Sequence, residues 1–409
     1  MSAHQEGLWR VERIVRGSAF QHVSSVHHIT GDLDVAALGR AVLALGRRHE
    51  LLHTGYRASG DELLAEPADP VPLRTLRVAD DAEAAEILQA EHDRPFDLDG
   101  EPVFRPLLVT TGTASHLILV LHHLICDAQS FSVIHGDLGR LYALEAGLDG
   151  GSPPPPLELQ YSDLARAAAD PDAVARAEAY WREKLDGVEE IRFRSSAGAG
   201  DAERRFGTIS VPVGASWQEA LEQECRDQRS TPFLVFGAAV LAAIAPRIVG
   251  TDLRLGAIFL NRLAPGAEHV VGPFAEGMLL RVDASGDPDA RVLHDRLRDE
   301  LIEAVEHSAL PFDDLVANVE ATGFDREKLV PFSLSIATAP EPLRLAGVVT
   351  EPAAPAEPEE SEGGVAVGLH LDLDLAGDRC VATFDEAFVP EPEVRLVIDE
   401  AMRRVARRR

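Results

Sequence analysis

The stretch LHHLICDAQS, residues 121–130, places two adjacent histidines at the end of an apolar run and an aspartate four residues after the second histidine. An imidazole with a pKa near neutrality can take a proton from an amine or a hydroxyl as that group attacks a carbonyl carbon. His122, His123 and Asp127 therefore point to acyl transfer. The sequence has no GxSxG nucleophile turn, so it does not predict a covalent acyl-enzyme.

The two histidines cannot share one role while the strand stays regular, because adjacent side chains on a strand point to opposite faces. We therefore expect one imidazole to be catalytic and the other to be structural. Two alternatives stay open from these residues alone. HHxxxD offers three metal ligands, although adjacent imidazoles diverge and no fourth-ligand motif is visible, so we predict no metal. Buried histidines that only bond to backbone are the other alternative.

The elements around the motif must place it at the rim of a sheet. Five consecutive aliphatic residues in 116–123 predict a strand buried on both faces. Ser130 is the predicted cap of the helix that follows. Residues 34–52 predict an amphipathic helix with Asp34 as its N-cap.

The second half of the chain repeats the alternation of helices and strands. Residues 231–250 are almost wholly apolar and predict a buried helix, and residues 252–262 predict a strand. The acidic, proline-rich run 351–364 predicts a mobile loop. An α/β fold with two domains, 1–170 and 171–409, follows from this order.

The composition excludes several classes of protein. The 409 residues are 45% hydrophobic and carry a formal net charge of −29, which repels nucleic acid and anionic membranes. No run of about 18 uncharged apolar residues occurs, and no leader pattern is visible, so neither a membrane span nor a signal peptide is predicted. Cys126, Cys225 and Cys380 form no CxxC, which fits a reducing cytoplasm.

HHLICDA resembles the HHxxxDG signature of the condensation domains of nonribosomal peptide synthetases, within the chloramphenicol acetyltransferase-like superfamily. Other segments that resemble landmarks of this family follow in order along nearly the whole chain. They are SAHQEGLW (2–9), RRHELLHTGY (47–56), LQYSDLA (159–165), YWREKLDG (180–187), VVGPFAEGMLLRV (270–282) and HSALPFDDLV (307–316).

The resemblance implies two chloramphenicol acetyltransferase-like lobes in a V-shaped pseudo-dimer with a central tunnel. It implies an enzyme of natural-product biosynthesis that forms an amide or ester bond. Since no adenylation or carrier segment fits within 409 residues, we expect a free-standing, cytoplasmic enzyme, and an excised domain is the alternative. The acyl or aminoacyl thioester would arrive on the phosphopantetheine arm of an acyl or peptidyl carrier protein, with no cofactor bound directly. The acceptor would be an amine or alcohol, either a small molecule or carrier-bound.

The resemblance also assigns roles to residues. His123 matches the catalytic histidine, which acts as a general base or as a hydrogen-bond donor to the nucleophile and the tetrahedral intermediate. His122 would be structural. Asp127 would pair with Arg281 and tie the two lobes together at the active site, and the backbone N–H of Ala128 would approach the developing oxyanion.

Besides His53, which stands where arginine is usual, four positions in the histidine motif and the tunnel segment depart from the family pattern. Ala128 stands where glycine is usual and adds a methyl group, and Gln129 replaces a bulkier residue. Glu276 and Gly277 stand where the family that the chain resembles has an Asn-Thr pair near the tunnel. A carboxylate at 276 would favour a cationic or amine acceptor if it points inward, whereas solvent or a salt bridge is the alternative.

Two other functions remain open. The first is a coenzyme-A-dependent acyltransferase of the same superfamily, which a basic patch for the nucleotide phosphates would favour. The second is a degenerate condensation-like domain that recruits a partner enzyme. Departures from the motif favour recruitment, and the presence of His123, Asp127 and Arg281 favours catalysis.

Overall fold

The computed structural model describes residues 1–14, 17, 19–60, 62–148, 151–168, 170–196, 205–320, 326–353 and 368–406. The chain divides into two compact units. Unit 1 comprises Met1–Ala169, Leu260–Ala275 and Pro340–Gly363, and unit 2 comprises Asp170–Phe259, Glu276–Ala339 and Gly364–Arg409. A single division after residue 170 therefore does not describe the chain, because two later segments group with unit 1.

Unit 1 is built on a five-stranded sheet in the order β14-β1-β7-β6-β4, and it also holds a small sheet in the order β3-β2-β5. Its strands are β1 (His22–Thr30), β2 (Thr54–Ser59), β3 (Glu62–Pro67), β4 (Arg74–Arg77), β5 (Asp99–Pro102), β6 (Phe104–Thr110), β7 (Ser115–His122) and β14 (Val349–Ala353). Its helices are α1 (Ala3–Ile14), α2 (Val35–Arg48), α3 (Asp81–Asp93), α4 (Ala128–Glu145) and α5 (Tyr161–Ala168).

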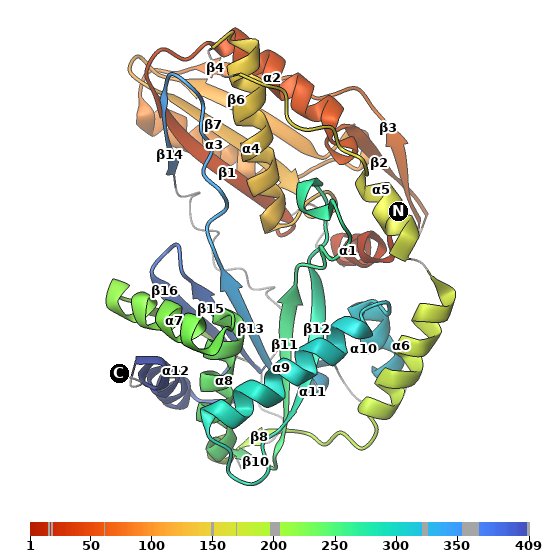
Figure 1. Ribbon diagram of the computed structural model, residues 1–409. Helices are drawn as coiled ribbons and strands as arrows, with labels where there is room; N and C mark the ends of the chain where they lie inside the picture. Colours follow the sequence, from red (N-terminus) through yellow and green to blue (C-terminus); the bar gives the residue numbers. More distant parts are fainter. Residues whose placement is uncertain are drawn as a thin grey trace. The chain divides into compact units, whose positions relative to one another are not determined.

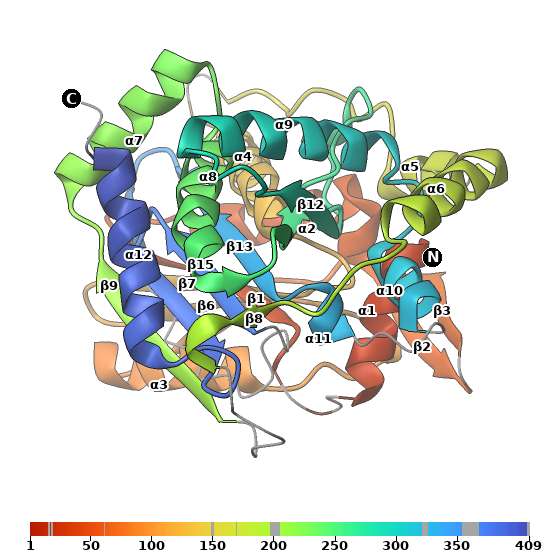
Figure 2. The same ribbon diagram turned by 90° about the horizontal axis from the view of Figure 1, so that it is seen from below.

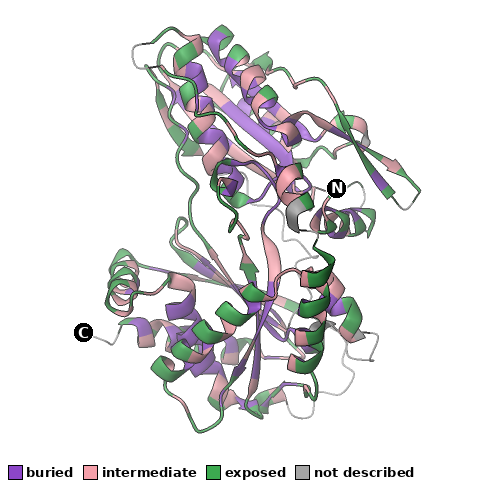
Figure 3. Cartoon of the chain, turned by 45° about the vertical axis from the view of Figure 1, so that its right-hand side comes forward, coloured by how far each residue is buried: buried purple, intermediate pink, exposed green. Residues whose placement is uncertain are grey.

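Strand β7 is buried on both faces, as its aliphatic run predicts. Leu117, Leu119 and Leu121 belong to the core that α2 and α4 cover, while Ile118 and Val120 pack in the separate core under α3. Helices α2 and α4 lie against each other over one face of the sheet (Figure 1). Figure 3 shows the resulting buried strands between helices whose outer faces are exposed. This sandwich fixes the end of β7, where the histidines lie.

Unit 2 is built on a six-stranded mixed sheet in the order β12-β11-β13-β15-β16-β9, and β10 pairs with β8 separately. Its strands are β8 (Arg192–Phe193), β9 (Phe206–Pro212), β10 (Ile248–Val249), β11 (Asp252–Phe259), β12 (Glu276–Asp283), β13 (Phe332–Ala337), β15 (Leu369–Asp374) and β16 (Arg379–Asp385). Its helices are α6 (Pro171–Lys184), α7 (Ala215–Gln228), α8 (Pro232–Ile244), α9 (Ala290–Glu306), α10 (Phe312–Glu320), α11 (Arg326–Leu329) and α12 (Glu391–Ala406).

Helix α8 forms the centre of the unit 2 core. Its residues from Leu234 to Ile244 are all buried, because its sequence is apolar on every side. Helices α7, α9 and α12 contact it, and Figure 2 shows α7, α8 and α12 close together. No single helix among the described residues is long and apolar enough to cross a membrane, although Ala215–Gln228 and Pro232–Arg247, bent by 103°, pass that test as a pair.

Two predicted elements end differently from expectation. The strand predicted for 252–262 stops at Phe259, and residues 260–275 belong to unit 1. The acidic run predicted as a loop over 351–364 begins inside β14, which pairs antiparallel with β1. Strand β14 lies at the edge of the sheet. Backbone pairing at an edge does not need an apolar sequence, so composition does not predict this strand. Residues 354–364 lie outside the described part of the chain.

Candidate functional site

His122 is a buried structural residue of β7. Its side chain is 1% exposed. Its Nδ1 accepts a hydrogen bond from the N–H of Leu124 at 3.0 Å, so Nε2 carries the proton and donates to Glu12 of α1 at 3.3 Å. Both ring nitrogens are occupied within the fold, which leaves His122 no free nitrogen for a substrate.

His123 follows the last residue of β7 and is only half-buried. Its Nδ1 donates to the carbonyl of Cys126 at 3.3 Å, which leaves Nε2 as the basic nitrogen of the neutral ring. No described residue bonds to that Nε2. Burial is the main cause that lowers the pKa of His123, and His122 adds to the effect. The imidazole is therefore neutral near pH 7 and able to accept a proton.

Asp127 is the N-cap of helix α4. Its Oδ1 accepts from the N–H and the hydroxyl of Ser130, each at 2.8 Å, and completes a capping box. The prediction of Ser130 as the cap is wrong by three residues, because Ser130 is the N3 partner in the box. Asp127 is 2% exposed and has no hydrogen bond to His123, so it holds the helix start and not the imidazole.

The predicted pair between Asp127 and Arg281 is wrong. The guanidinium that binds Asp127 belongs to Arg262, with Nη2 at 2.7 Å from Oδ1. Arg281 instead binds Asp252 through two bonds of 2.8 and 3.1 Å within unit 2. Strand β12 starts at Glu276, and Arg281 lies about 17 Å further along the strand. There it is the pairing partner of Arg254 on β11.

Arg262 is the functional-site residue that the sequence analysis missed. Its Nη1 also donates to the carbonyls of Ala267 and Val270 at 2.8 and 2.6 Å, and its guanidinium lies 4.2 Å from the centre of the Phe274 ring. The backbone N–H of Phe274 donates to Asp127 Oδ2 at 3.3 Å. The one signal in the sequence is a lone arginine just before a segment that contains Pro and Gly. The predicted strand 252–262 includes this arginine, whereas β11 ends at Phe259.

Ala128 and Gln129 occupy the exposed first turn of α4. Ala128 is not among the described residues with positive φ, so this turn does not need glycine. Its N–H has no hydrogen-bond partner among the described residues and lies at the positive end of the α4 dipole. The methyl group of Ala128 therefore leaves the backbone donor available.

Two of the other sequence motifs contact the histidine turn and the middle of α4. The Gln5 amide donates to the carbonyl of Leu124 at 2.8 Å, directly after the two histidines. Arg48 and His49 of the α2 end bind Asp137 of α4 at 2.6 and 2.9 Å. The first contact supports the histidine turn, the second holds α2 against α4, and neither adds a reactive group to the turn.

A second histidine pair, which the sequence analysis did not single out, lies in unit 1. Nε2 of His27 on β1 lies 3.2 Å from Nε2 of His135 on α4, with the hydroxyl of Ser25 at 2.8 Å from His135. His135 Nδ1 donates to the carbonyl of Glu341 at 2.6 Å. Burial lowers the pKa of His27 to about 3, so the pair is neutral and structural. The described residues contain no group of three or more metal ligands.

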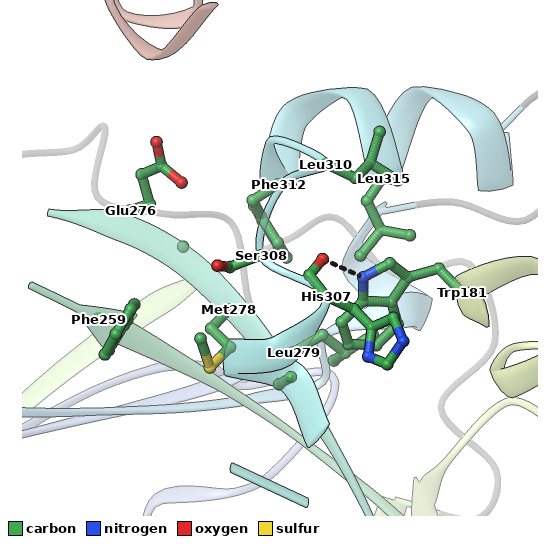
Figure 4. Close-up of a pocket in the computed structure, with 12 residues that line it drawn as sticks. Trp181, Phe259, Glu276, Met278, Leu279, His307, Ser308, Leu310, Phe312 and Leu315 are labelled. Atoms are coloured by element: carbon green, nitrogen blue, oxygen red, sulfur yellow. Dashed lines mark hydrogen bonds between the residues drawn. The ribbon is translucent and has the colours of Figure 1, made fainter. Parts of the chain in front are cut away.

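Glu276 and Gly277 line a small open pocket in unit 2, whose space of about 330 Å³ between atoms includes open solvent. Figure 4 shows the Glu276 carboxylate at one edge, with Phe259, Met278 and Phe312 around the pocket. A Cβ on Gly277 would meet the Phe312 ring at 2.8 Å, so the ring occupies the space of the usual threonine side chain. Burial, and then the charge of Asp313, raises the pKa of Glu276 to about 7.

Residues 1–346 match the family model described as "Condensation domain". The chain belongs to the condensation-domain family. Cyclosporin synthetase from Tolypocladium inflatum is 30% identical over 325 residues, which cover 76% of this chain and 2% of that protein. Phosphinothricin tripeptide synthetase from Streptomyces viridochromogenes is 31% identical over 336 residues, which cover 77% of this chain and 30% of that protein. The chain thus spans a small part of each synthetase.

Solved condensation-type structures share the fold over the whole chain. The X-domain from teicoplanin biosynthesis superposes with a TM-score of 0.77 at 21% identity, covering 100% of this chain and 95% of that one. The condensation domain of the monacolin K polyketide synthase gives 0.77 at 18% identity, with 100% and 96% covered. The mixed α/β architecture is therefore the chloramphenicol acetyltransferase-like fold of condensation domains.

Proposed function

We propose that this condensation-domain protein is a catalyst, with His123 as the group that accepts the proton of the nucleophile. It would join an acyl or aminoacyl group, held as a thioester on a carrier protein's phosphopantetheine arm, to an amine or hydroxyl. The observation that carries the proposal is the His123 ring, whose Nδ1 is tied to the Cys126 carbonyl while Nε2 has no partner among the described residues. A neutral ring with one free basic nitrogen is what general-base catalysis requires.

The residues around His123 support the reaction as follows. The nucleophile's nitrogen or oxygen attacks the thioester carbonyl while Nε2 takes its proton. The negative oxygen of the tetrahedral intermediate is stabilised by the N–H of Ala128 at the start of α4. Collapse of the intermediate expels the carrier thiolate, which takes the proton from His123. Asp127 and Arg262 hold the helix start in place without touching the imidazole.

Recruitment of a partner enzyme is the second candidate, and one comparison favours it. The complex of the X-domain and OxyB from teicoplanin biosynthesis matches with a TM-score of 0.76 at 20% identity, covering 100% of this chain and 93% of that chain. Under this alternative the exposed Ala128 and Gln129 mark a site that does not turn over substrate, and the protein binds another enzyme.

Turnover with acyl-loaded carrier protein and a panel of amines and alcohols tests the proposal. The wild type is compared with His123→Ala, and intact-mass spectrometry follows loss of the acyl group from the carrier together with the appearance of amide or ester. Product from the wild type and none from the variant supports catalysis. No product from either protein across the panel, with tight binding of a tailoring enzyme, supports recruitment.

A further inference from the structure

Glu276 is the charged group of the unit 2 pocket that has no counter-ion. It starts strand β12 and is half-buried. Among the described residues, no lysine, arginine or histidine lies within ion-pair distance of its carboxylate, and no described group donates a hydrogen bond to it. The nearby charge that acts on it is a second carboxylate, that of Asp313. A partly desolvated carboxylate beside a like charge is costly, and a bound cation removes that cost.

The rest of the pocket suits an ammonium group carried on an aliphatic chain. Phe259, Met278 and Phe312 supply apolar walls, and Ser308 supplies a hydroxyl that Figure 4 shows directed toward β12. Aromatic faces attract cations through their quadrupole, and methylene groups pack against such side chains. An anionic group would meet repulsion from the Glu276 carboxylate.

The pocket is held in shape by contacts between two distant motifs of unit 2. Tyr180 stacks on His307 with ring centres 3.7 Å apart, and the Trp181 indole N–H donates to the carbonyl of His307 at 3.2 Å. Gly277 lets the Phe312 ring lie directly against β12. A preformed wall of this kind lowers the ordering cost of a ligand.

We propose that this pocket binds a protonated primary amine of the acceptor molecule, with Glu276 as its counter-ion. The inference rests on the proposed function for its biological meaning, since it names the acceptor class as diamines or similar basic amines. One amino group stays protonated in the pocket, and a second, neutral amino group is the nucleophile.

Calorimetric titration of the full chain with 1,5-diaminopentane, at about pH 8 and without carrier protein, tests the proposal. Glu276→Gln keeps the shape and removes the charge, and we expect it to weaken diamine binding about ten-fold or more. The neutral 1,5-pentanediol should bind both proteins equally weakly. Glu276→Gln should unfold at the same temperature as the wild type or higher, because the carboxylate it removes has no partner.

Equal affinity of the diamine for the two proteins, or no diamine binding to the wild type, overturns the proposal. Because binding is measured without turnover, a protein that fails the condensation assay can still pass this one. Conversely, a protein that turns over alcohols alone and does not bind the diamine keeps the proposed function and refutes the amine pocket. Asp313→Asn is the matched control, and we expect a smaller loss of affinity from it than from Glu276→Gln.

Discussion

Asp127 is both the cap of helix α4 and one partner of a buried ion pair. Its residue type and spacing predict that it matters for the site, but they do not predict which arginine it binds. The sequence identifies the carboxylate but not its partner, because Arg262 lies 135 residues away and is brought to it by a segment that leaves the unit 2 sheet. The prediction of Arg281 rests on a motif, whereas the observed pair depends on where β11 ends.

Arg262→Ala should destabilise the protein more than Arg281→Ala. Removal of Arg262 leaves the buried Asp127 charge uncompensated, which costs about 3–5 kcal/mol. The Arg281–Asp252 pair is 24% and 28% exposed at its two side chains, so its loss should cost about 1–2 kcal/mol. Urea titration of both variants measures the free energies of unfolding. Equal losses, or a larger loss for Arg281→Ala, would contradict the pairing.

Ala128→Gly should leave turnover within about three-fold of the wild type. Ala128 has an exposed methyl group and no positive φ, so glycine adds flexibility at the first helical position without opening a blocked turn. The stability should fall by less than about 1 kcal/mol. Steady-state rates of the two proteins decide the point, and a large gain in rate for the glycine variant would mean that the methyl group obstructs the substrate.

Hydrophobic periodicity predicts those helices and strands that form because one or both of their faces pack into a core. Strand β7 and helices α2 and α8 lie where their hydrophobic patterns place them, and Asp34 caps α2 by accepting from Ala37 at 2.8 Å. Strand β14 is not predictable in this way. It forms because residues 349–353 pair with β1, and backbone hydrogen bonds carry no signature in an acidic, proline-containing sequence.

Gly277→Ala should destabilise unit 2 by about 1–3 kcal/mol. The new Cβ would lie 2.8 Å from the Phe312 ring, which must move and thereby disturb the pocket. Gly136→Ala is the matched control. That glycine lies exposed in α4 with nothing within 4 Å of its Cβ position, so alanine should stabilise the helix by about 0.5–1 kcal/mol. Thermal unfolding of both variants should shift in opposite directions, and a shift in the same direction would refute the close approach.

At the scale of the whole molecule, a set of histidines buried in neutral form sets the response to acid. Burial lowers the pKa of His22 to about 4 and that of His27 to about 3, against about 6.5 for an unfolded imidazole. At a pH between about 4 and 6.5, the two imidazoles bind protons in the unfolded chain but stay neutral in the folded chain. Stability is therefore complete above about pH 6.5 and falls as the pH decreases toward 4.

His27→Gln should reduce this loss of stability, because one group that must stay neutral is removed. Free energies of unfolding at about pH 7.5 and pH 5 give the slope for the variant and for the wild type. His269→Gln is the control, since that imidazole is 67% exposed and should leave the slope unchanged. A His27→Gln slope as steep as that of the wild type would contradict the assignment.

Catalysis by this protein, as proposed, requires His123 to act as a base through its one free nitrogen. The most direct measurement is single-turnover transfer from an acyl-loaded carrier protein to an amine, comparing the wild type with His123→Ala at equal fold content by circular dichroism. We predict that the variant is slower by roughly 10²–10⁴-fold while its unfolding temperature is unchanged. Transfer by folded His123→Ala at the wild-type rate would rule out His123 as the catalytic base.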